Sequence, residues 1–336
     1  MSPKNLKVKD SQPLPVERSW LRTFLALFVV VAAILTGSFF IIGALLPEKV
    51  AHTIVEKGST PAQVVGSPLD KGMKYEEVSF KSPDGLTLKG WWIPAPKGKE
   101  QGTVVLAHGI FHNRMQMFSR AVFFHEAGYQ VLMMDLRGHG ESEKAPMSCG
   151  VEESKDLVGA ADYLRAGKKL RSPLVFCGLS LGAMSALRAG VTESEAVLIL
   201  DSPLPDAKSY VSHLTSGKWF IHIPGLAARC VKAYNKDTGL HLTLEDFDLF
   251  PAARQLKDRW VLIFVGEKDD LAPVKEVERL FKDIPTRTKQ LFITPMAGHE
   301  GTYPSAPALY ERTVLAFLDS YKKSAVLKAG KQKSTR

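Results

Sequence analysis

The sequence of 336 residues is poor in cysteine and has neither a low-complexity block nor an internal repeat. Its three cysteines, Cys149, Cys177 and Cys230, form no CxxC pair and lie near no histidine cluster at metal-ligand spacing. This excludes a zinc site and a disulfide framework as the basis of the fold, while a single disulfide with one free thiol stays open. With 45% apolar and 24% charged residues, the composition is that of a globular protein.

The middle of the chain also lacks an excess of charge of one sign. Residues 1–22 carry five Lys or Arg against two acids, and residues 322–336 carry six and no acid. The two ends therefore account for the whole net charge of +9. This argues against the basic stripe of a nucleic-acid-binding domain. We expect the basic tail at 324–336 to be a solvated, disordered end, with contact to anionic lipid headgroups as an alternative.

One long apolar run, the 23 residues from Phe24 to Leu46, contains no charge. As a helix it would be about 35 Å long, enough to cross a hydrocarbon core of roughly 30 Å. The run is longer than the apolar part of a cleaved signal peptide, and no convincing cleavage site follows it. We predict a transmembrane anchor at 23–46, followed by a linker at 47–72.

The charges that flank this run predict its orientation. Five Lys or Arg precede it and only Lys49 and Lys57 closely follow it. The positive-inside rule then places the basic N-terminus (1–22) in the cytoplasm and the domain that follows the anchor on the extracytoplasmic side.

Beyond the linker, short apolar runs alternate with helical stretches. Strands are predicted at 75–80, 86–93, 104–107, 131–134, 174–177, 197–200, 261–265 and 291–293, and helices near 114–127, 151–166, 181–190, 274–283 and 306–322. Asp84-Gly85 is typical of a hairpin turn between the first two strands. Since continuous apolar strands separated by helices indicate a parallel sheet covered on both faces, we predict one α/β domain at 73–323.

The alternation breaks once, between Leu200 and Trp260. These 59 intervening residues contain no clear strand but several aromatic and aliphatic side chains. A structureless loop of this length would be unusual in a compact domain. We therefore predict a helical cap at about 201–259.

The run Gly178-Leu179-Ser180-Leu181-Gly182 matches the pattern G-x-S-x-G and lies between a predicted strand and a predicted helix. So sharp a strand-to-helix turn needs small residues two positions before and after the serine. The turn lifts the serine off the strand end, and we predict that Ser180 is a nucleophile. A serine that only caps the helix is the structural alternative.

A serine hydroxyl needs a general base and an acid that orients it. Asp269 and His299 each follow a later predicted strand, at the sheet edge where open α/β sheets form their sites. We predict Asp269 and His299 as the partners of Ser180, with Asp270 and Asp201 as alternative acids. His112 and His139 lie on loops of the same edge and are expected to serve structure or substrate contact.

The turn His108-Gly109-Ile110-Phe111 follows the strand at 104–107. It would aim a backbone N–H at a reacting carbonyl oxygen, and we predict Ile110 and Leu181 as the two backbone donors of an oxyanion hole. An ordinary strand-to-helix turn is the alternative reading. His108 is expected to be a packing residue.

Together these residues resemble the α/β-hydrolase superfamily over roughly 75–322. The stretches Ser82–Pro94, Asp135–Ser142 and Phe264–Asp269 are similar to single-pass, membrane-anchored ABHD-type serine hydrolases and their bacterial relatives. The resemblance implies a mostly parallel sheet with helices on both faces, structural roles for Asp135 and Arg137, and no cofactor. It further implies hydrolysis of carboxylic esters, often acyl glycerols or lysophospholipids.

The sequence leaves other functions open. The run Ile110-Phe111-His112 is bulkier than the residues often found after His-Gly, which would narrow the oxyanion region. An esterase, monoacylglycerol lipase or lysophospholipase that acts on lipophilic acyl esters is the expected function. An amide, peptide or thioester hydrolase with the same three residues is an alternative. So is a non-catalytic binding protein of the same fold, although all three residues are in place.

Overall fold

The computed structural model describes residues 62–167, 169–206 and 225–334, together with Phe24, Val55 and the short stretches 27–31, 45–49 and 51–52. The chain divides into two units, Met1–Leu46 and Pro47–Arg336. The predicted basic N-terminus lies outside the described residues, and so does most of the predicted anchor at 23–46. Within the described parts, no helix combines the length and apolar character that crossing a bilayer requires.

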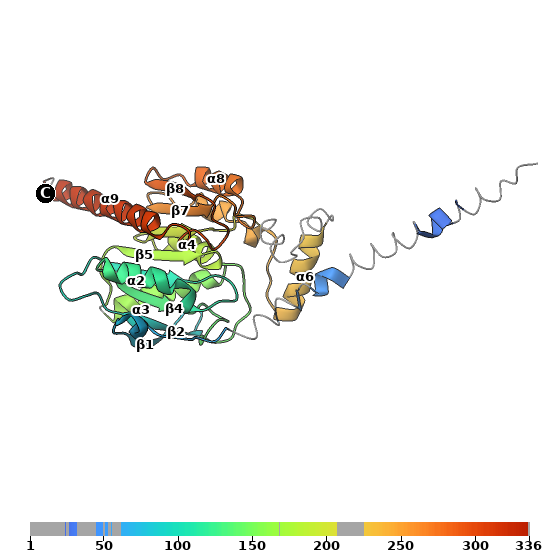
Figure 1. Cartoon of the computed structure of the whole chain (residues 1–336), viewed down its shortest axis with the longest axis horizontal. Helices are drawn as coiled ribbons and strands as arrows, with labels where there is room; N and C mark the ends of the chain where they lie inside the picture. The colour runs from blue at the N-terminus through green and yellow to red at the C-terminus, as the bar shows by residue number, and fades with distance from the viewer. Residues whose placement is uncertain are drawn as a thin grey trace, which may run out of the picture. The chain divides into compact units, whose positions relative to one another are not determined.

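In the second unit, strands of the described residues form one sheet in the order β1-β2-β4-β3-β5-β6-β7-β8 (Figure 1). They are β1 (Glu76–Lys81), β2 (Thr87–Ile93), β3 (Thr103–Ala107), β4 (Gln130–Met134), β5 (Leu174–Leu179), β6 (Val197–Asp201), β7 (Val261–Gly266) and β8 (Lys289–Thr294). β2 pairs antiparallel with β1 and β4, and all other pairs are parallel. The predicted strands and the mostly parallel sheet are confirmed.

The predicted hairpin and helices are also present. Gly85 N–H donates to the Ser82 carbonyl at 2.9 Å in the turn between β1 and β2. The helices are η2 (Arg114–Met117), α2 (Phe118–Glu126), α3 (Glu153–Ala166), α4 (Leu181–Thr192), α8 (Val274–Asp283) and α9 (Pro307–Ser334). α9 continues through most of the segment that we expected to be a disordered tail. Its last turns contain several Lys and two Ala, which favour helix.

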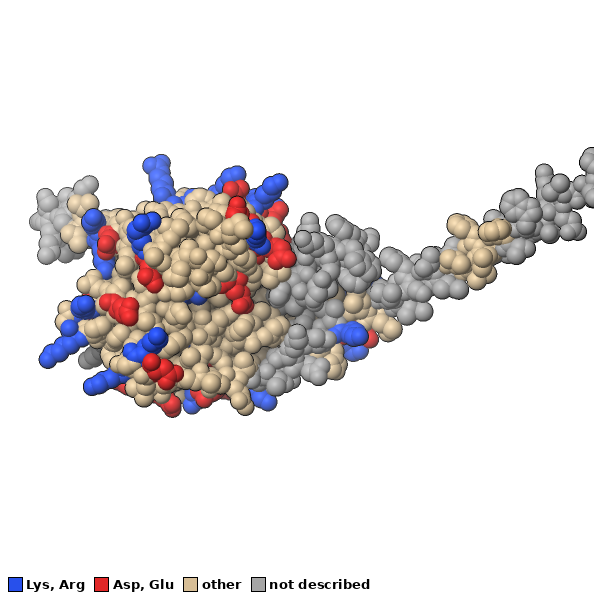
Figure 2. All heavy atoms as spheres, in the orientation of Figure 1, with Lys and Arg blue, Asp and Glu red and all other residues tan. Residues whose placement is uncertain are grey.

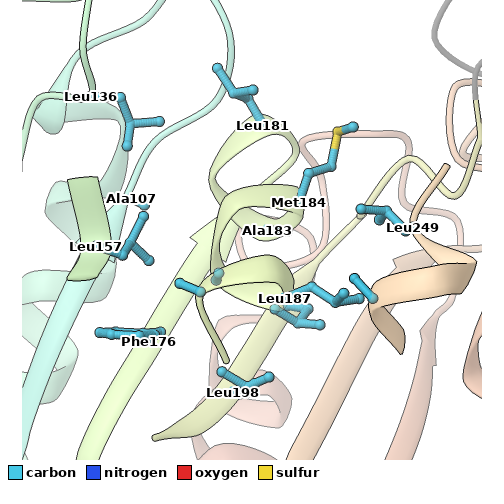
Figure 3. Close-up of a cluster of buried hydrophobic side chains, with 14 of the residues drawn as sticks. Ala107, Leu136, Leu157, Phe176, Leu181, Ala183, Met184, Leu187, Leu198 and Leu249 are labelled. Carbon is cyan, nitrogen blue, oxygen red and sulfur yellow. The ribbon is translucent and has the colours of Figure 1, made fainter. Parts of the chain in front are cut away.

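A hydrophobic core lies on each face of the sheet, because alternate residues of a strand point to opposite faces. Val105 and Ala107 of β3 belong to the core formed with α3, α4 and α8, whereas Val104 and Leu106 belong to the core formed with α2 and α9. Figure 3 shows Leu187 of α4 in the first core, together with side chains of α3, β5 and β6. Two covered faces explain why these strands are continuous apolar runs.

Between β6 and β7, the described residues contain helices and no strand. They are α6 (Leu226–Thr238), the short η4 (Glu245–Phe247) and α7 (Phe250–Ala253). The described part of the segment predicted as a cap thus contains helices joined by residues without regular structure, while residues 207–224 lie outside the described part.

Described residues of the segment at 47–72, which we predicted to be a linker, pack against the core of the second unit. Ala51 is fully buried in the core, and Val55 packs against the same core. The Asn113 side chain donates to the carbonyls of Ala62 and Gln63 at 3.0 and 2.9 Å. The short helix η1 (Pro68–Lys71) follows. The sequence did not reveal this packing because the segment carries no strong periodic pattern.

Candidate active site

Ser180 occupies the turn between β5 and α4, in a strained backbone conformation with φ of 53° and ψ of −111°. The two flanking glycines make this turn possible. A Cβ at Gly178 would lie 2.1 Å from the Gly182 carbonyl oxygen, and a Cβ at Gly182 would lie 2.1 Å from the Ala107 carbonyl oxygen. Because both obstacles are backbone atoms, no side-chain movement would relieve them. The local sequence therefore fixes Ser180 at the carboxyl end of β5.

His299 and Asp269 meet Ser180 at this end of the sheet. Nε2 of His299 lies 2.8 Å from Oγ of Ser180, and Nδ1 lies 3.0 Å from each carboxylate oxygen of Asp269. Oδ1 of Asp269 also accepts hydrogen bonds from the N–H groups of Leu271 and Ala272, at 3.0 and 2.8 Å. The Asp269 side chain is fully buried, and that of His299 is 12% exposed. The arrangement has the geometry of a nucleophile, a base and an orienting acid.

The two alternative acids, Asp201 and Asp270, have surroundings that differ from those of Asp269. Asp201, fully buried at the end of β6, accepts from Nε of Arg120 at 2.8 Å and from the Tyr310 hydroxyl at 3.0 Å. Although burial opposes it, this carboxylate raises the pKa of Arg120. Asp270 is exposed. Of the three candidate acids, Asp269 is the one that contacts the imidazole of His299.

The predicted oxyanion loop packs directly against Ser180. A Cβ at Gly109 would lie 3.6 Å from Cβ of Ser180. Leu181 is the first residue of α4, so its N–H has no acceptor within the helix. Ile110, half-buried, follows Gly109 on the loop. These positions suit the predicted donors Ile110 and Leu181, whose roles stay predictions.

His108 holds this loop, as its expected packing role implies. Nδ1 lies 2.7 Å from the Gly109 carbonyl and therefore carries the hydrogen, while Nε2 accepts from the Leu136 N–H at 3.1 Å. Burial lowers the pKa of His108 well below its ordinary value. The ring is neutral and fully used in these contacts, so it is not a base for the reaction.

Gln116 is a site residue that the sequence analysis missed. Its Oε1 accepts the Gly109 N–H at 2.6 Å, which fixes the loop one residue before Ile110. Gln116 lies on the short helix η2, and no motif or spacing in the sequence distinguishes it from other polar residues. Its contact with Gly109 depends on the position of η2 above β3.

Asp135 and Arg137 have structural roles, as the resemblance implied. Asp135 accepts from the backbone N–H of Arg114 at 2.7 Å and of Glu141 at 2.9 Å. Arg137 binds Asp84 and Asp156 with its guanidinium. These contacts hold the loop after β4 at the edge of the site.

The two remaining histidines of this edge differ in their surroundings. Nδ1 of His139 lies 2.8 Å from the Arg137 carbonyl, so the ring is tied to the loop after β4. His112 pairs with Glu300, the neighbour of His299, at 3.4 Å. Both histidines thus have structural contacts next to the site.

Neither a metal site nor a disulfide is present in the described residues. None of their His, Cys, Asp and Glu side chains form a group of three or more that could hold a metal ion. Cys149, Cys177 and Cys230 are buried, and none of them is in a disulfide. Figure 2 shows Lys and Arg interspersed with Asp and Glu on the face in view. This mixture agrees with the near-neutral middle of the sequence.

Among known proteins, the model of the alpha/beta hydrolase family matches residues 104–313 of this chain. The chain belongs to this family. This alpha/beta hydrolase is similar to the Bacillus subtilis protein YqkD. The two are 26% identical over 310 residues, which cover 83% of this chain and 96% of YqkD. It is 24% identical to the Arabidopsis thaliana alpha/beta hydrolase domain-containing protein WAV2, over 82% of this chain and 88% of WAV2.

A solved structure agrees with this assignment. The esterase Pf2001 of Pyrococcus furiosus matches this alpha/beta hydrolase with a TM-score of 0.63 and 26% identity, over 78% of this chain and 97% of the esterase. The predicted resemblance to α/β hydrolases, including an ABHD-type protein and bacterial relatives, is confirmed.

Proposed function

We propose that this α/β hydrolase cleaves carboxylic esters through an acyl-enzyme formed on Ser180. One observation carries the proposal: the continuous chain of contacts from Oγ of Ser180 through the His299 ring to the Asp269 carboxylate, at 2.8 and 3.0 Å. Because the buried carboxylate of Asp269 accepts the hydrogen of Nδ1, Nε2 of His299 can accept the proton of Ser180.

The reaction then follows from these positions. Oγ of Ser180 attacks the acyl carbon while its proton passes to Nε2 of His299, and Asp269 stabilises the resulting imidazolium. The N–H groups of Ile110 and Leu181 donate to the oxyanion. Collapse of the intermediate expels the alcohol, which takes the proton from His299. Water, deprotonated by the same imidazole, then attacks the acyl-enzyme and releases the acid.

The similarity to the Pyrococcus furiosus esterase supports an ester as the substrate over an amide or thioester. The sequence of the segment between β6 and β7 is rich in aromatic and aliphatic residues, which favours lipophilic acyl esters.

Replacement of the nucleophile tests the proposal. Ser180→Ala should lower kcat for an acyl ester by about 10⁴–10⁶ and abolish labelling by a fluorophosphonate. Ser185→Ala is the matched control, since Oγ of Ser185 donates to the Leu181 carbonyl within the same helix and faces no base. Its turnover should stay within a few-fold of wild type. Wild-type turnover by Ser180→Ala would contradict the proposal.

We further propose that residues 23–46 anchor the chain in a membrane, with the N-terminus cytoplasmic and the hydrolase domain extracytoplasmic. The uncharged run from Phe24 to Leu46 and the excess of Lys and Arg before it support this. In a bacterial host, the full chain should resist extraction of the membranes by alkaline carbonate. Protease added to spheroplasts should digest the hydrolase domain; protection of the domain would reverse the proposed orientation.

A further inference from the structure

A cavity of about 280 Å³ adjoins the loops of the candidate active site. Phe111, which follows Ile110, lines it, and so do Gly138 and His139 of the loop after β4. The His139 ring centre lies 5.1 Å from that of His108, which precedes Gly109 beside Ser180. The cavity is therefore positioned to receive part of a molecule whose reacting carbon lies at Ser180.

The lining of this cavity is mainly apolar. Phe111, Pro146, Met147 and Tyr234 contribute to it. The Tyr234 hydroxyl donates to the Met147 carbonyl at 2.7 Å, so its polar atom is already satisfied. The charged lining residues Lys144 and Asp237 are exposed and of opposite sign. Such a lining favours an uncharged, apolar occupant.

One wall of the cavity includes a residue that precedes the first strand of the sheet. Val55 lines it together with Tyr234 and Thr238 of α6, although Val55 belongs to the segment that we predicted to be a linker. Ala51, four residues earlier, is fully buried in the core, and Val55 packs against that core. These contacts make Ala51 and Val55 part of the hydrolase unit.

We propose that the cavity holds the acyl chain of the substrate ester and that Val55 forms part of its wall. This inference rests on the proposed ester hydrolysis at Ser180. A water molecule occupies about 30 Å³ in the liquid, and a methylene group is of similar size, so the cavity holds roughly nine such groups. The preferred substrate is thus an ester of a medium-chain acid, near octanoate.

Partial filling of the cavity in the full chain tests the inference. With 4-nitrophenyl butanoate and octanoate as substrates, Val55→Trp should lower the octanoate-to-butanoate ratio of kcat/KM about tenfold or more, since each excluded methylene costs roughly fourfold. Val65→Trp is the matched control. Val65 belongs to the same segment at 47–72, but it is 74% exposed and does not line the cavity. Its ratio should equal that of wild type.

A second variant covers the case in which Val55→Trp does not fold. Val55→Ala enlarges the cavity by about two methyl groups and should raise the decanoate-to-octanoate ratio several-fold. Unchanged ratios in folded Val55 variants, with normal ester turnover, would overturn this inference alone. Absence of turnover of every ester by the wild type would overturn the proposed function, and the assignment of the acyl site with it.

Discussion

Both carboxylate oxygens of Asp269 lie 3.0 Å from Nδ1 of His299. The carboxylate holds the imidazole in the tautomer that leaves Nε2 free to accept a proton, and an asparagine in its place can present its NH₂ group instead. Asp269→Asn should therefore lower kcat by about 10⁴, measured as hydrolysis of an acyl ester.

The neighbouring Asp270 provides the control for this change. It is exposed and one residue away. Asp270→Asn should keep turnover within a few-fold of wild type. If the two variants lost activity equally, the assignment of the acid to Asp269 would be wrong.

The hydrogen bond from Gly109 to Gln116 predicts a role for Gln116 in catalysis through the position of the oxyanion loop. Gln116→Met keeps the size of the side chain but removes the acceptor for the Gly109 N–H. Misplacement of the loop should weaken the binding of the oxyanion more than that of the substrate. We expect kcat to fall about 10- to 100-fold and KM to change much less in steady-state kinetics.

Gln255→Met, at an exposed position of the segment after α7, is the matched control and should leave both constants unchanged. A rise in KM with an unchanged kcat in Gln116→Met would instead assign Gln116 to substrate binding.

The Tyr310 hydroxyl stabilises the buried carboxylate of Asp201, to which it donates at 3.0 Å. Tyr310→Phe leaves the ring in place and removes this donor. We expect a loss of about 1–3 kcal/mol in the free energy of unfolding, measured by urea denaturation, because a buried charge loses a hydrogen bond.

Tyr321→Phe tests whether this loss is specific to the buried hydroxyl. Tyr321 is also on α9, but its ring edge packs on Trp260 and its side chain is half-buried. Its loss should stay within about 0.5 kcal/mol. Equal losses in both variants would show that the contact with Asp201 adds no stability.

Asp84 makes part of the stability of the fold dependent on pH. The hydrogen bonds from Arg137 lower the pKa of Asp84 from its ordinary value of 3.8. Since the folded state holds the deprotonated form, this stabilisation is present above about pH 4 and is lost as pH falls toward the folded-state pKa. Because Asp84 is exposed and solvent screens its pairing with Arg137, Asp84→Asn should cost about 0.5–1 kcal/mol near pH 7, and its difference from wild type should shrink in denaturation curves taken at roughly pH 3.

Glu77→Gln removes an exposed carboxylate from β1 and serves as the control. Its difference from wild type should be small at both pH values. A gap between wild type and Asp84→Asn that widened on acidification would contradict the assigned direction of the pKa shift.

The sequence by itself determined the strands, the turn at Ser180 and the position of His299. Apolar runs such as Val104–Ala107 are local patterns that indicate a buried parallel strand wherever they occur. The glycines at 178 and 182 are required by backbone atoms of the turn and of the adjacent strand. His299 follows the last strand, so the shared carboxyl edge of a parallel sheet brings it toward Ser180.

Only the tertiary structure decided which acid serves His299 and which other residues complete the site. Asp201, Asp269 and Asp270 all lie near a strand end in the sequence, but Arg120 of α2 engages Asp201, while Asp270 faces solvent. Gln116 contacts Gly109, and Val55 lines the adjoining cavity, through packing between elements far apart in the chain. Residue spacing does not predict such contacts, because they depend on how whole helices and strands pack against one another.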